Sequence, residues 1–247
     1  MGRAKEIIVK VIPASVANPF VKKYHYSGKI VNNSRVHFGA FLDGKLHGVM
    51  SFGNSMDKSK IQGLVEGTGW NEFIELNRMA FDNYLPKNSE SRCIAIAIRL
   101  LKKNAPHIKW IISFADGTQC GDGTIYRASG FYLTGFSKGA MWLLPDYLRE
   151  LNGGAVAHRV KIQNKSSQIS KYILSQTNGK NLTMQQYVKK FGGEILDGYM
   201  LRYIYFIDKT CKDKLTVPIL PFSKIDEYNA GMYKGEKITQ AERHVNK

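Results

Sequence analysis

The chain has 247 residues, and its 43% hydrophobic content is enough to bury a core in one large domain or in one domain with an appendage. Its 36 Lys and Arg exceed its 20 Asp and Glu, and the net charge of +16 makes a polyanion such as nucleic acid the expected partner. Three scattered cysteines exclude a disulfide framework and a tetrahedral zinc site, and no apolar run is long enough to cross a membrane. We therefore expect a reduced, cytoplasmic setting and no membrane partner.

The first predicted elements are a strand, a helix and a hairpin. β-Branched residues predict a strand over 7–12, after which a proline turn leads into a helix that reaches about Tyr24. Apolar runs over 36–42 and 46–52 meet at an Asp-Gly pair, which is typical of a tight β-hairpin. These two runs are therefore expected to be antiparallel neighbours.

A further strand carries polar residues among apolar ones. We expect residues 63–69 to form a flexible connector and residues 73–81 to form a strand. Strict alternation along that strand would place Glu75, Asn77 and Met79 on one face.

The best-defined helix begins at Asn88 or Ser89, either of which can cap it, and ends before Pro106. Residues 108–114 follow as an almost wholly apolar strand. A strand, a helix and a second strand in this order imply a right-handed crossover, so the two strands are expected to be parallel. The fold class predicted from these elements is α/β, with a central mixed sheet flanked by helices.

The second half of the chain is organised less regularly. We expect a helix over 142–151, a strand over 200–207 and a flexible tail over 227–247. Residues 151–193 contain no Asp or Glu, although a solvated surface normally mixes charges of both signs. We interpret residues 1–226 as a single catalytic domain in which 151–193 is a basic insertion, the alternative being an ordinary charged surface. The residues expected to contact a phosphate backbone are Arg159, Lys161, Lys165, Lys171, Lys189 and Lys190.

The order of elements resembles the Gcn5-related N-acetyltransferase (GNAT) fold. The run IYRASGF at 125–131 is similar to the late helix of that superfamily, whose Tyr often protonates the departing thiolate of coenzyme A. In typical members a glycine-rich turn cradles the pyrophosphate of the cofactor. Here the turn at 85–90 reads LPKNSE, without glycine and with an acid that would repel phosphate. The resemblance therefore argues against ordinary acetyl-CoA binding and leaves the donor of the transferred group unknown.

Five motifs in order resemble the phage Mom proteins more specifically. They are YHYSG at 24–28, ELNR at 75–78, PKNSES at 86–91, SFAD at 113–116 and GTIYRA at 123–128. That family is related to the acetyltransferases and converts the exocyclic amine of adenine in phage DNA to an acetamido (carbamoylmethyl) form, which protects the DNA from restriction. The resemblance implies a DNA-modifying transferase with DNA as its partner.

Adenine N6 is paired and stacked inside a duplex, so an enzyme that acts on it must extrude the base or bind single strands. A flipped base calls for an aromatic-lined pocket beside a cationic track. The residues expected to contact the substrate are Tyr24, Tyr26, Asn77, Asn88, Ser89 and Arg127.

The candidate catalytic residues are Asp116, Tyr126, Glu75, Arg78, Ser113 and His25. Asp116 at a strand exit, Glu75 and His25 are possible proton acceptors, and Tyr126 on the short helix facing Asp116 is the candidate donor. Arg78 is able to hold a carboxylate, a phosphate or Glu75 itself, and Ser113 to orient the bridging group. We expect the 24–26 segment and the loop after residue 116 to converge on one purine-sized cavity.

The resemblance also implies an iron requirement, for which His25, Tyr26 and Asp116 would supply imidazole, phenolate and carboxylate ligands. Two other functions stay open: an N-acyltransferase acting on another amine, of an RNA base or a protein, and a non-catalytic DNA-binding protein. Glu75 and Arg78 are also compatible with a buried pair of structural role only. The oligomeric state is open, with a homodimer as one alternative.

Overall fold

The structure is a computed structural model that describes residues 3–119, 121–138, 141–196, 198–227, 231–233, 236–239 and 242. The chain divides into two compact units. The first contains Met1–Ala115, Gly123–Gly135 and Leu201–Lys224, and the second contains Asp116–Asp122, Phe136–Met200 and Ile225–Lys247. The domain boundaries expected from the sequence stay a prediction.

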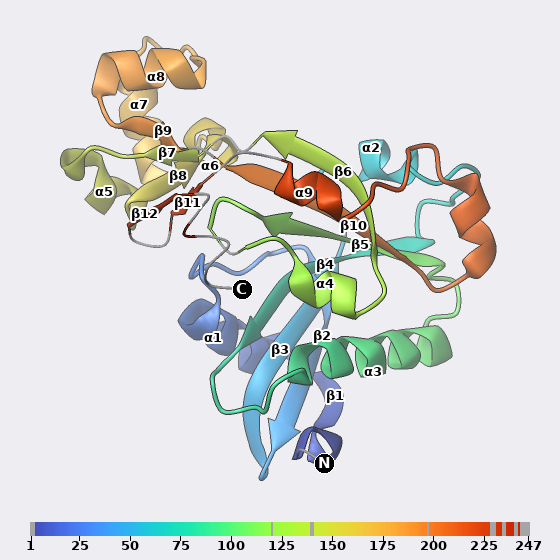
Figure 1. Cartoon of the computed structure of the whole chain (residues 1–247). Coiled ribbons are helices and arrows are strands. Elements are labelled where there is room, and N and C mark those ends of the chain that lie inside the picture. The colour runs from blue at the N-terminus through green and yellow to red at the C-terminus, as the bar shows by residue number, and fades with distance from the viewer. Residues whose placement is uncertain are drawn as a thin grey trace. The chain divides into compact units, whose positions relative to one another are not determined.

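A seven-stranded mixed sheet, whose residues belong mostly to the first unit, has the strand order β1-β2-β3-β4-β5-β10-β6 (Figure 1). The four strands β1 to β4 are antiparallel neighbours, and β4 pairs with β5 in parallel. The expected mixed sheet and its parallel pair are therefore confirmed. The strands are β1 (Ile8–Ile12), β2 (Ser34–Leu42), β3 (Lys45–Gly53), β4 (Phe73–Phe81), β5 (Trp110–Asp116), β6 (Tyr132–Lys138) and β10 (Tyr199–Phe206).

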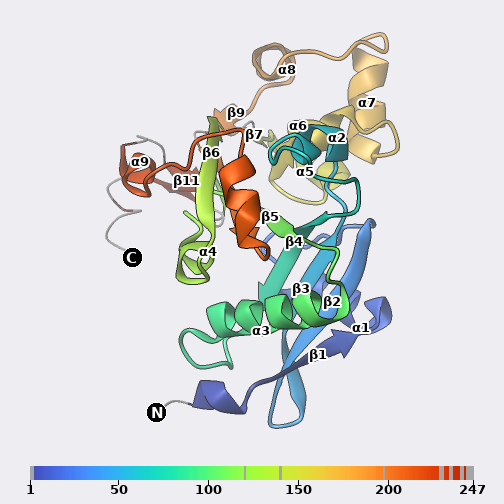
Figure 2. The same cartoon turned by 90° about the vertical axis from the view of Figure 1, so that its right-hand side faces the viewer.

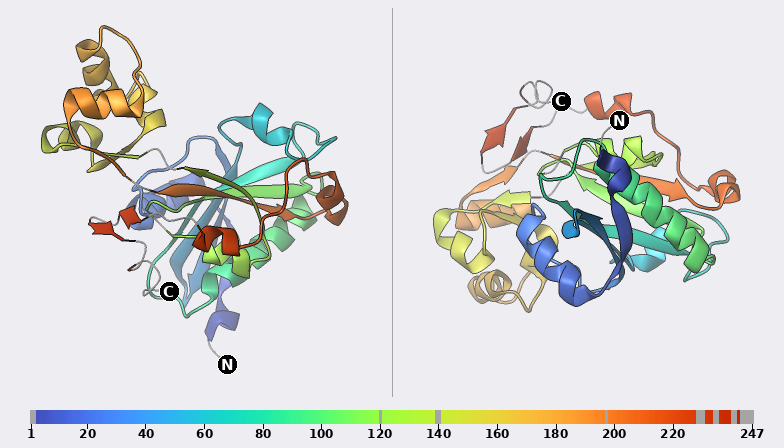
Figure 3. Two further views of the ribbon diagram at one scale, coloured as in Figure 1. Left: turned by 45° about the horizontal axis from the view of Figure 1, so that its top comes forward. Right: turned by 90° about the horizontal axis from the view of Figure 1, so that it is seen from below.

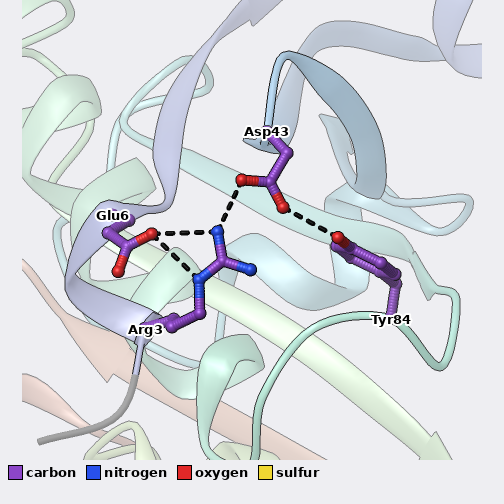
Figure 4. Close-up of polar contacts among 4 residues, drawn as sticks. All are labelled: Arg3, Glu6, Asp43 and Tyr84. Atoms are coloured by element: carbon purple, nitrogen blue, oxygen red, sulfur yellow. Dashed lines mark hydrogen bonds and ion pairs between the residues drawn. The ribbon is translucent and has the colours of Figure 1, made fainter.

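The expected hairpin joins β2 and β3 through a tight turn. Asp43 and Gly44 have φ angles of 50° and 74°, which are the left-handed values that a two-residue hairpin turn requires. Asp43 also accepts hydrogen bonds from Arg3, at 2.5 Å, and from the hydroxyl of Tyr84, at 2.7 Å, while Arg3 bonds Glu6 at 3.0 Å (Figure 4). These contacts attach the chain start and the segment after β4 to the hairpin tip.

Two helices cover opposite faces of this sheet (Figures 2 and 3). Helix α1 (Ala14–Tyr24) packs Ala17 and Val21 against Val49 of β3 and Ala80 of β4. Helix α3 (Ser89–Asn104) buries Ile94, Ile98 and Leu101 at the helical spacing expected from the sequence. Shorter helices elsewhere in the chain are η1 (Arg3–Glu6), α2 (Lys58–Gln62), α4 (Thr124–Ala128), η2 (Lys209–Lys214) and α9 (Ser223–Asp226).

Two local expectations in the first unit are wrong. Asn88 is the residue before α3, but it has a φ of 67° and its side chain makes no capping hydrogen bond. The expected flexible connector at 63–69 is packed, because Leu64 and Val65 are buried and Val65 forms a β-bridge with Leu215. A glycine-rich composition did not reveal this contact, since the partner lies in a distant part of the chain.

The second unit has its own hydrophobic core. An antiparallel sheet of order β8-β7-β9 and four helices surround Trp142 and Tyr187, which are fully buried and stack with ring centroids 5.9 Å apart. The acid-free segment 151–193 is therefore largely folded into packed elements. The strands of this sheet and the four helices are β7 (Met141–Leu143), β8 (Val156–His158), β9 (Glu194–Leu196), α5 (Asp146–Asn152), α6 (Arg159–Gln163), α7 (Gln168–Gln176) and α8 (Met184–Phe191).

The expected helix over 142–151 is only partly right, because residues 141–143 form β7 and the helix begins at Asp146, directly after Pro145. In the expected tail, β11 (Met232–Tyr233) pairs with β12 (Lys237–Ile238), and most other residues of 227–247 lie outside the described ranges. Cys93 and Cys211 are buried free thiols, whereas Cys120 is not among the described residues. In the described part of the chain, no helix has the length and apolarity needed to traverse a bilayer.

Candidate active site

A β-bulge on β4 decides which side chains share a face. Phe52 pairs with Leu76 and Ser51 pairs with Arg78, so β4 has one residue, Asn77, more than β3 between the two pairs. Adjacent residues of β3 point to opposite faces, so Leu76 and Arg78 also point to opposite faces. Glu75 and Arg78 therefore share one face, and the expectation that Met79 shares it with Glu75 is wrong.

Arg78 is a half-buried cation on this face. Its Nε donates to the carbonyl of Lys29 at 2.8 Å, and a terminal nitrogen donates to the carbonyl of Asn77 at 2.6 Å. Burial lowers the pKa of Arg78, and nearby Tyr26, Glu75 and Tyr126 oppose that shift. Side chains from three segments of the first unit therefore influence the charge of Arg78.

Glu75 is the acidic member of the group. Burial raises the pKa of its carboxyl, while the Ser55 hydroxyl and the charge of Arg78 act in the opposite direction. Gly53 of β3 pairs with Glu75, so the loop that carries Ser55 starts directly beside it. A carboxyl group with a raised pKa is suited to accept a proton near neutral pH.

His25 lies at the end of α1, where its backbone N–H donates to the carbonyl of Val21. The backbone N–H of Ser27 donates to the His25 Nδ1 atom at 3.2 Å, and the Ser27 hydroxyl lies 2.8 Å from the same atom. Burial and the nearby Arg78 lower the pKa of His25 to about 4. The ring is therefore neutral at pH 7, and because Nδ1 accepts a backbone hydrogen bond, its proton lies on Nε2.

Tyr126 is held by aromatic packing. Its ring lies 5.4 Å from Phe131 and 5.2 Å from Tyr203, and the residue is 9% exposed. Helix α4 starts after Gly123, whose φ of 76° and closeness to Tyr203 leave no room for a side chain. In the first unit, Glu75 and Arg78 thus share one face of β4, Arg78 bonds the carbonyl of Lys29 four residues after His25, and Tyr126 influences the pKa of Arg78.

Three other expected site residues have internal contacts. The Ser113 hydroxyl is fully buried and donates to the carbonyl of Leu76 at 2.8 Å, on the face opposite Glu75 by the β4–β5 register. The buried Ser89 hydroxyl donates to the carbonyl of Pro86. Asn77 accepts from the Ser34 hydroxyl at 3.0 Å, whereas its buried amide nitrogen has no partner among the described residues.

The other expected substrate contacts lie on the surface of the first unit. Tyr24 is 38% exposed and packs its ring against that of Phe20 in a tilted arrangement, and Tyr26 is 51% exposed with its ring 4.3 Å from that of His25. Arg127 is exposed and lies over the ring of Phe222. Asn88 is exposed before α3.

Asp116 ends β5, as expected, and belongs to the second unit. It is 7% exposed, and burial raises its pKa, while the Thr118 backbone N–H at 2.9 Å and the nearby His158 lower it. The expected cavity between Asp116 and the 24–26 segment joins the two units, so it stays a prediction.

The residues expected to bind iron are not preorganised for metal binding. A His that binds a metal normally donates its other ring N–H to an acceptor, but the His25 Nδ1 atom accepts from Ser27 instead. Metal binding through Nε2 would therefore require this hydrogen bond to break or the ring to lose both protons. In the described ranges, no three His, Cys, Asp or Glu side chains are grouped closely enough to hold a metal ion. The residues of the first unit do not fit the expected metal, and none of the chemistry below depends on it.

The residues expected to contact phosphate are all in the second unit. Arg159, Lys165, Lys171 and Lys189 are exposed. Lys161 is half-buried and donates to the carbonyl of Asn152, and exposed Lys190 donates to the carbonyl of Gln176. Four of the six cations are therefore exposed to solvent. The described contacts show no structural role for these four side chains.

Sequence reasoning missed Ser27, Lys29 and Ser55, which hold or adjust His25, Arg78 and Glu75. Ser27 lies inside the first motif, and its spacing of two residues from His25 is the one available signal. The carbonyl of Lys29 and the hydroxyl of Ser55 reach the site only through the fold. No pattern in the sequence could have identified them.

Comparison with known proteins gives one family. Residues 6–224 match the Mom protein family. The methylcarbamoylase Mom of Escherichia phage Mu is 33% identical over 155 residues, which are 62% of this chain and 64% of that protein. The match thus spans less than two thirds of the length of this relative.

Similarity to solved structures is looser. A Bacillus subtilis acetyltransferase in complex with CoA superposes with a TM-score of 0.44 and 10% identity, over 81% of this chain and 99% of that one. The ribosomal-protein-S18-alanine N-acetyltransferase of Escherichia coli has a TM-score of 0.42 and 9% identity, over 81% of this chain and 94% of its own. The family assignment rests on the sequence match.

Proposed function

Because the chain belongs to the Mom protein family, we propose that it is a transferase that attaches a carbamoylmethyl group to the exocyclic amine of adenine in DNA. The observation that carries this proposal is that Glu75 and Arg78 share one face of β4, where Arg78 also donates to the carbonyl of Lys29, the residue after the first motif. Its action on phage DNA would take place in the cytoplasm of the host, where the modification would protect that DNA from restriction.

Glu75 is the proposed general base. As the bond between adenine N6 and the methylene carbon of the donor forms, the amine loses a proton, and Glu75 accepts it. Burial raises the pKa of the Glu75 carboxyl toward neutrality, which makes the ionised form a better proton acceptor than an exposed carboxylate. Asp116, the alternative acceptor, is also buried with a raised pKa.

Arg78 and Tyr126 serve the other side of the reaction. The guanidinium, fixed by two backbone carbonyls, directs its remaining N–H groups at an oxygen of the transferred or departing group and stabilises negative charge there. Tyr126 supplies a proton to the leaving group as its bond to the methylene carbon breaks. The donor itself is an activated carbamoylmethyl compound whose carrier is not specified by these residues.

His25 acts as a hydrogen-bond donor and does not act as a base in this proposal. Its Nδ1 lone pair is already used by Ser27, and Nε2 carries the proton. A neutral imidazole N–H beside Tyr26 is suited to bind a carbonyl oxygen or a purine ring nitrogen. This role differs from the proton acceptor expected from the sequence.

The test is mass spectrometry of nucleosides from plasmid DNA isolated after expression of the protein. We expect deoxyadenosine heavier by one carbamoylmethyl group. Unchanged deoxyadenosine in cells that contain the soluble protein would contradict the proposal. In that case, tight binding of acetyl-CoA would favour an acyltransferase for another amine, and full biological activity of Tyr126→Phe would favour a non-catalytic DNA-binding protein.

A further inference from the structure

Lys58, the first residue of helix α2 in the connection between β3 and β4, is a buried cation without an acidic partner among the described residues. It is only 9% exposed, and no carboxylate in the described ranges pairs with it. Its Nζ instead donates to the side-chain oxygens of Asn54, at 3.2 Å, and Asn71, at 3.3 Å. Burial and the nearby Arg35 lower the pKa of Lys58. Arg35 is exposed and follows Ser34, which pairs with Gly53 where the chain leaves β3 toward Lys58.

An exposed tryptophan covers this cation. The Lys58 Nζ lies 4.6 Å from the centroid of the Trp70 ring and 5.6 Å from that of Phe73. Phe73 is buried, but Trp70 is 52% exposed. A large ring that is fixed on one side by a cation and open to solvent on the other has the properties of a base-stacking platform.

The platform lies on the same sheet face as the candidate catalytic group. Phe73 and Glu75 are two residues apart on β4, before the bulge, so their side chains point to the same side. Two residues advance a strand by about 7 Å, so Phe73, whose ring lies beside the same Lys58 Nζ, is about that far from Glu75 along β4. Asn54 and Ser55 connect the two places directly, because Asn54 holds Lys58 and Ser55 influences Glu75.

We propose that Trp70, supported by Lys58, stacks on a DNA base that neighbours the target adenine, and that the exposed Arg35 binds the phosphate of that nucleotide. The exposed charge of Arg35 matches a phosphate, and the exposed ring matches a base. This inference rests on the proposed function for the identity of the nucleic acid. It assigns the β3–β4 loop a function in holding the strand while the target base is in the site.

Tryptophan fluorescence gives a direct test, because the other two tryptophans, Trp110 and Trp142, are fully buried. Addition of a single-stranded oligodeoxynucleotide containing adenine should quench the fluorescence of the wild-type protein. Trp70→Phe should remove this quenching while the ring still binds. Trp70→Ala should weaken binding roughly 5- to 150-fold, the range expected for loss of one base–aromatic stack.

Two controls separate stacking from general damage to the loop. Met56→Ala removes a 79% exposed side chain from the same loop and should leave the Kd within about twofold of wild type. An oligonucleotide with abasic sites beside the adenine should bind wild type and Trp70→Ala equally. Arg35→Ala should make the slope of log K against log salt less steep, by the amount expected for release of roughly one counterion fewer.

Persistent quenching in Trp70→Phe, or a Kd of Trp70→Ala that matches wild type, would overturn the inference. The proposed function fails in a different way. If the wild-type protein leaves deoxyadenosine unmodified but shows quenching that depends on Trp70, the result would support the nucleotide subsite and contradict the proposed reaction.

Discussion

Acidification should destabilise this protein through His25, and the size of the effect follows from the site. Burial and Arg78 lower the pKa of His25 from 6.5 to about 4. Between these values the imidazole of the unfolded chain binds a proton that the folded protein does not, so the free energy of unfolding falls as the pH falls. A difference of about 2.5 between the two pKa values corresponds to roughly 3 kcal/mol in the free energy of unfolding. The folded protein has this stability in full above about pH 6.5 and has lost it by about pH 4.

The measurement is urea unfolding of wild type and His25→Gln, followed by tryptophan fluorescence from about pH 7.5 to about pH 4. Gln is chosen because its side-chain oxygen is able to accept the Ser27 backbone N–H. The stability of wild type relative to the variant should fall by roughly 3 kcal/mol over this range, which isolates His25 from the five other histidines. A difference that does not change with pH would refute the buried, neutral imidazole, and an NMR tautomer signal showing a proton on Nδ1 would refute its hydrogen bonding.

Three further predictions concern other parts of the chain. Glu75→Gln keeps the shape of the side chain but removes the base, so adenine modification should fall roughly 10²- to 10⁴-fold in nucleoside mass spectrometry while the thermal unfolding temperature stays close to that of wild type. Gly123→Ala should lower the free energy of unfolding by more than Gly130→Ala, because both glycines have positive φ but a Cβ at position 123 would lie 2.5 Å from the Tyr203 ring, against 3.7 Å from Tyr205 at position 130; equal losses in chemical denaturation would show that the contact is not tight. Replacing the exposed Lys165, Lys171 and Lys189 by Ala should flatten the dependence of log K for duplex DNA on log salt by roughly 0.9 for each phosphate that the protein no longer neutralises, and an unchanged slope would place the phosphate track elsewhere.

Elements with a strong local signal were predictable from the sequence. The Asp-Gly turn specified the β2–β3 hairpin because both residues tolerate the left-handed conformation that this turn requires. The spacing of Ile94, Ile98 and Leu101 predicted α3, and the apolar run after it predicted a strand parallel to β4. In each of these cases a short stretch of chain contains the whole signal.

Features that depend on a distant partner were not predictable. The bulge at Asn77 is defined by how β4 pairs with β3, which the sequence of β4 alone does not show. Because of the bulge, Arg78 and not Met79 lies on the same face as Glu75. The protonation of His25 depends on Arg78, which is 53 positions further along the chain, and on the local bend that brings the Ser27 N–H to Nδ1. Lys58 and Trp70 likewise looked like ordinary residues of a polar loop until the fold placed them together.

The membership of the site stays a prediction from the five motifs. The structure places Glu75 and Arg78 on one face of β4 and bonds Arg78 to the carbonyl of Lys29, four residues after His25. Ser113 was expected to orient the reacting group, but its buried hydroxyl donates to the carbonyl of Leu76 on the neighbouring strand. Motifs identify which residues matter, whereas hydrogen bonds determine what each one is able to do.

The central claim is that the half-buried guanidinium of Arg78 organises the reaction, and its most direct test compares two arginines. Arg202 is also partly buried, has a pKa lowered by burial and bonds a backbone carbonyl, that of Thr134, but no described acid or candidate catalytic tyrosine surrounds it. Nucleosides from plasmid DNA should contain carbamoylmethylated adenine when Arg202→Met is expressed and none above background when Arg78→Met is expressed at the same soluble level. Modified adenine at the wild-type amount in the Arg78→Met sample would contradict the account.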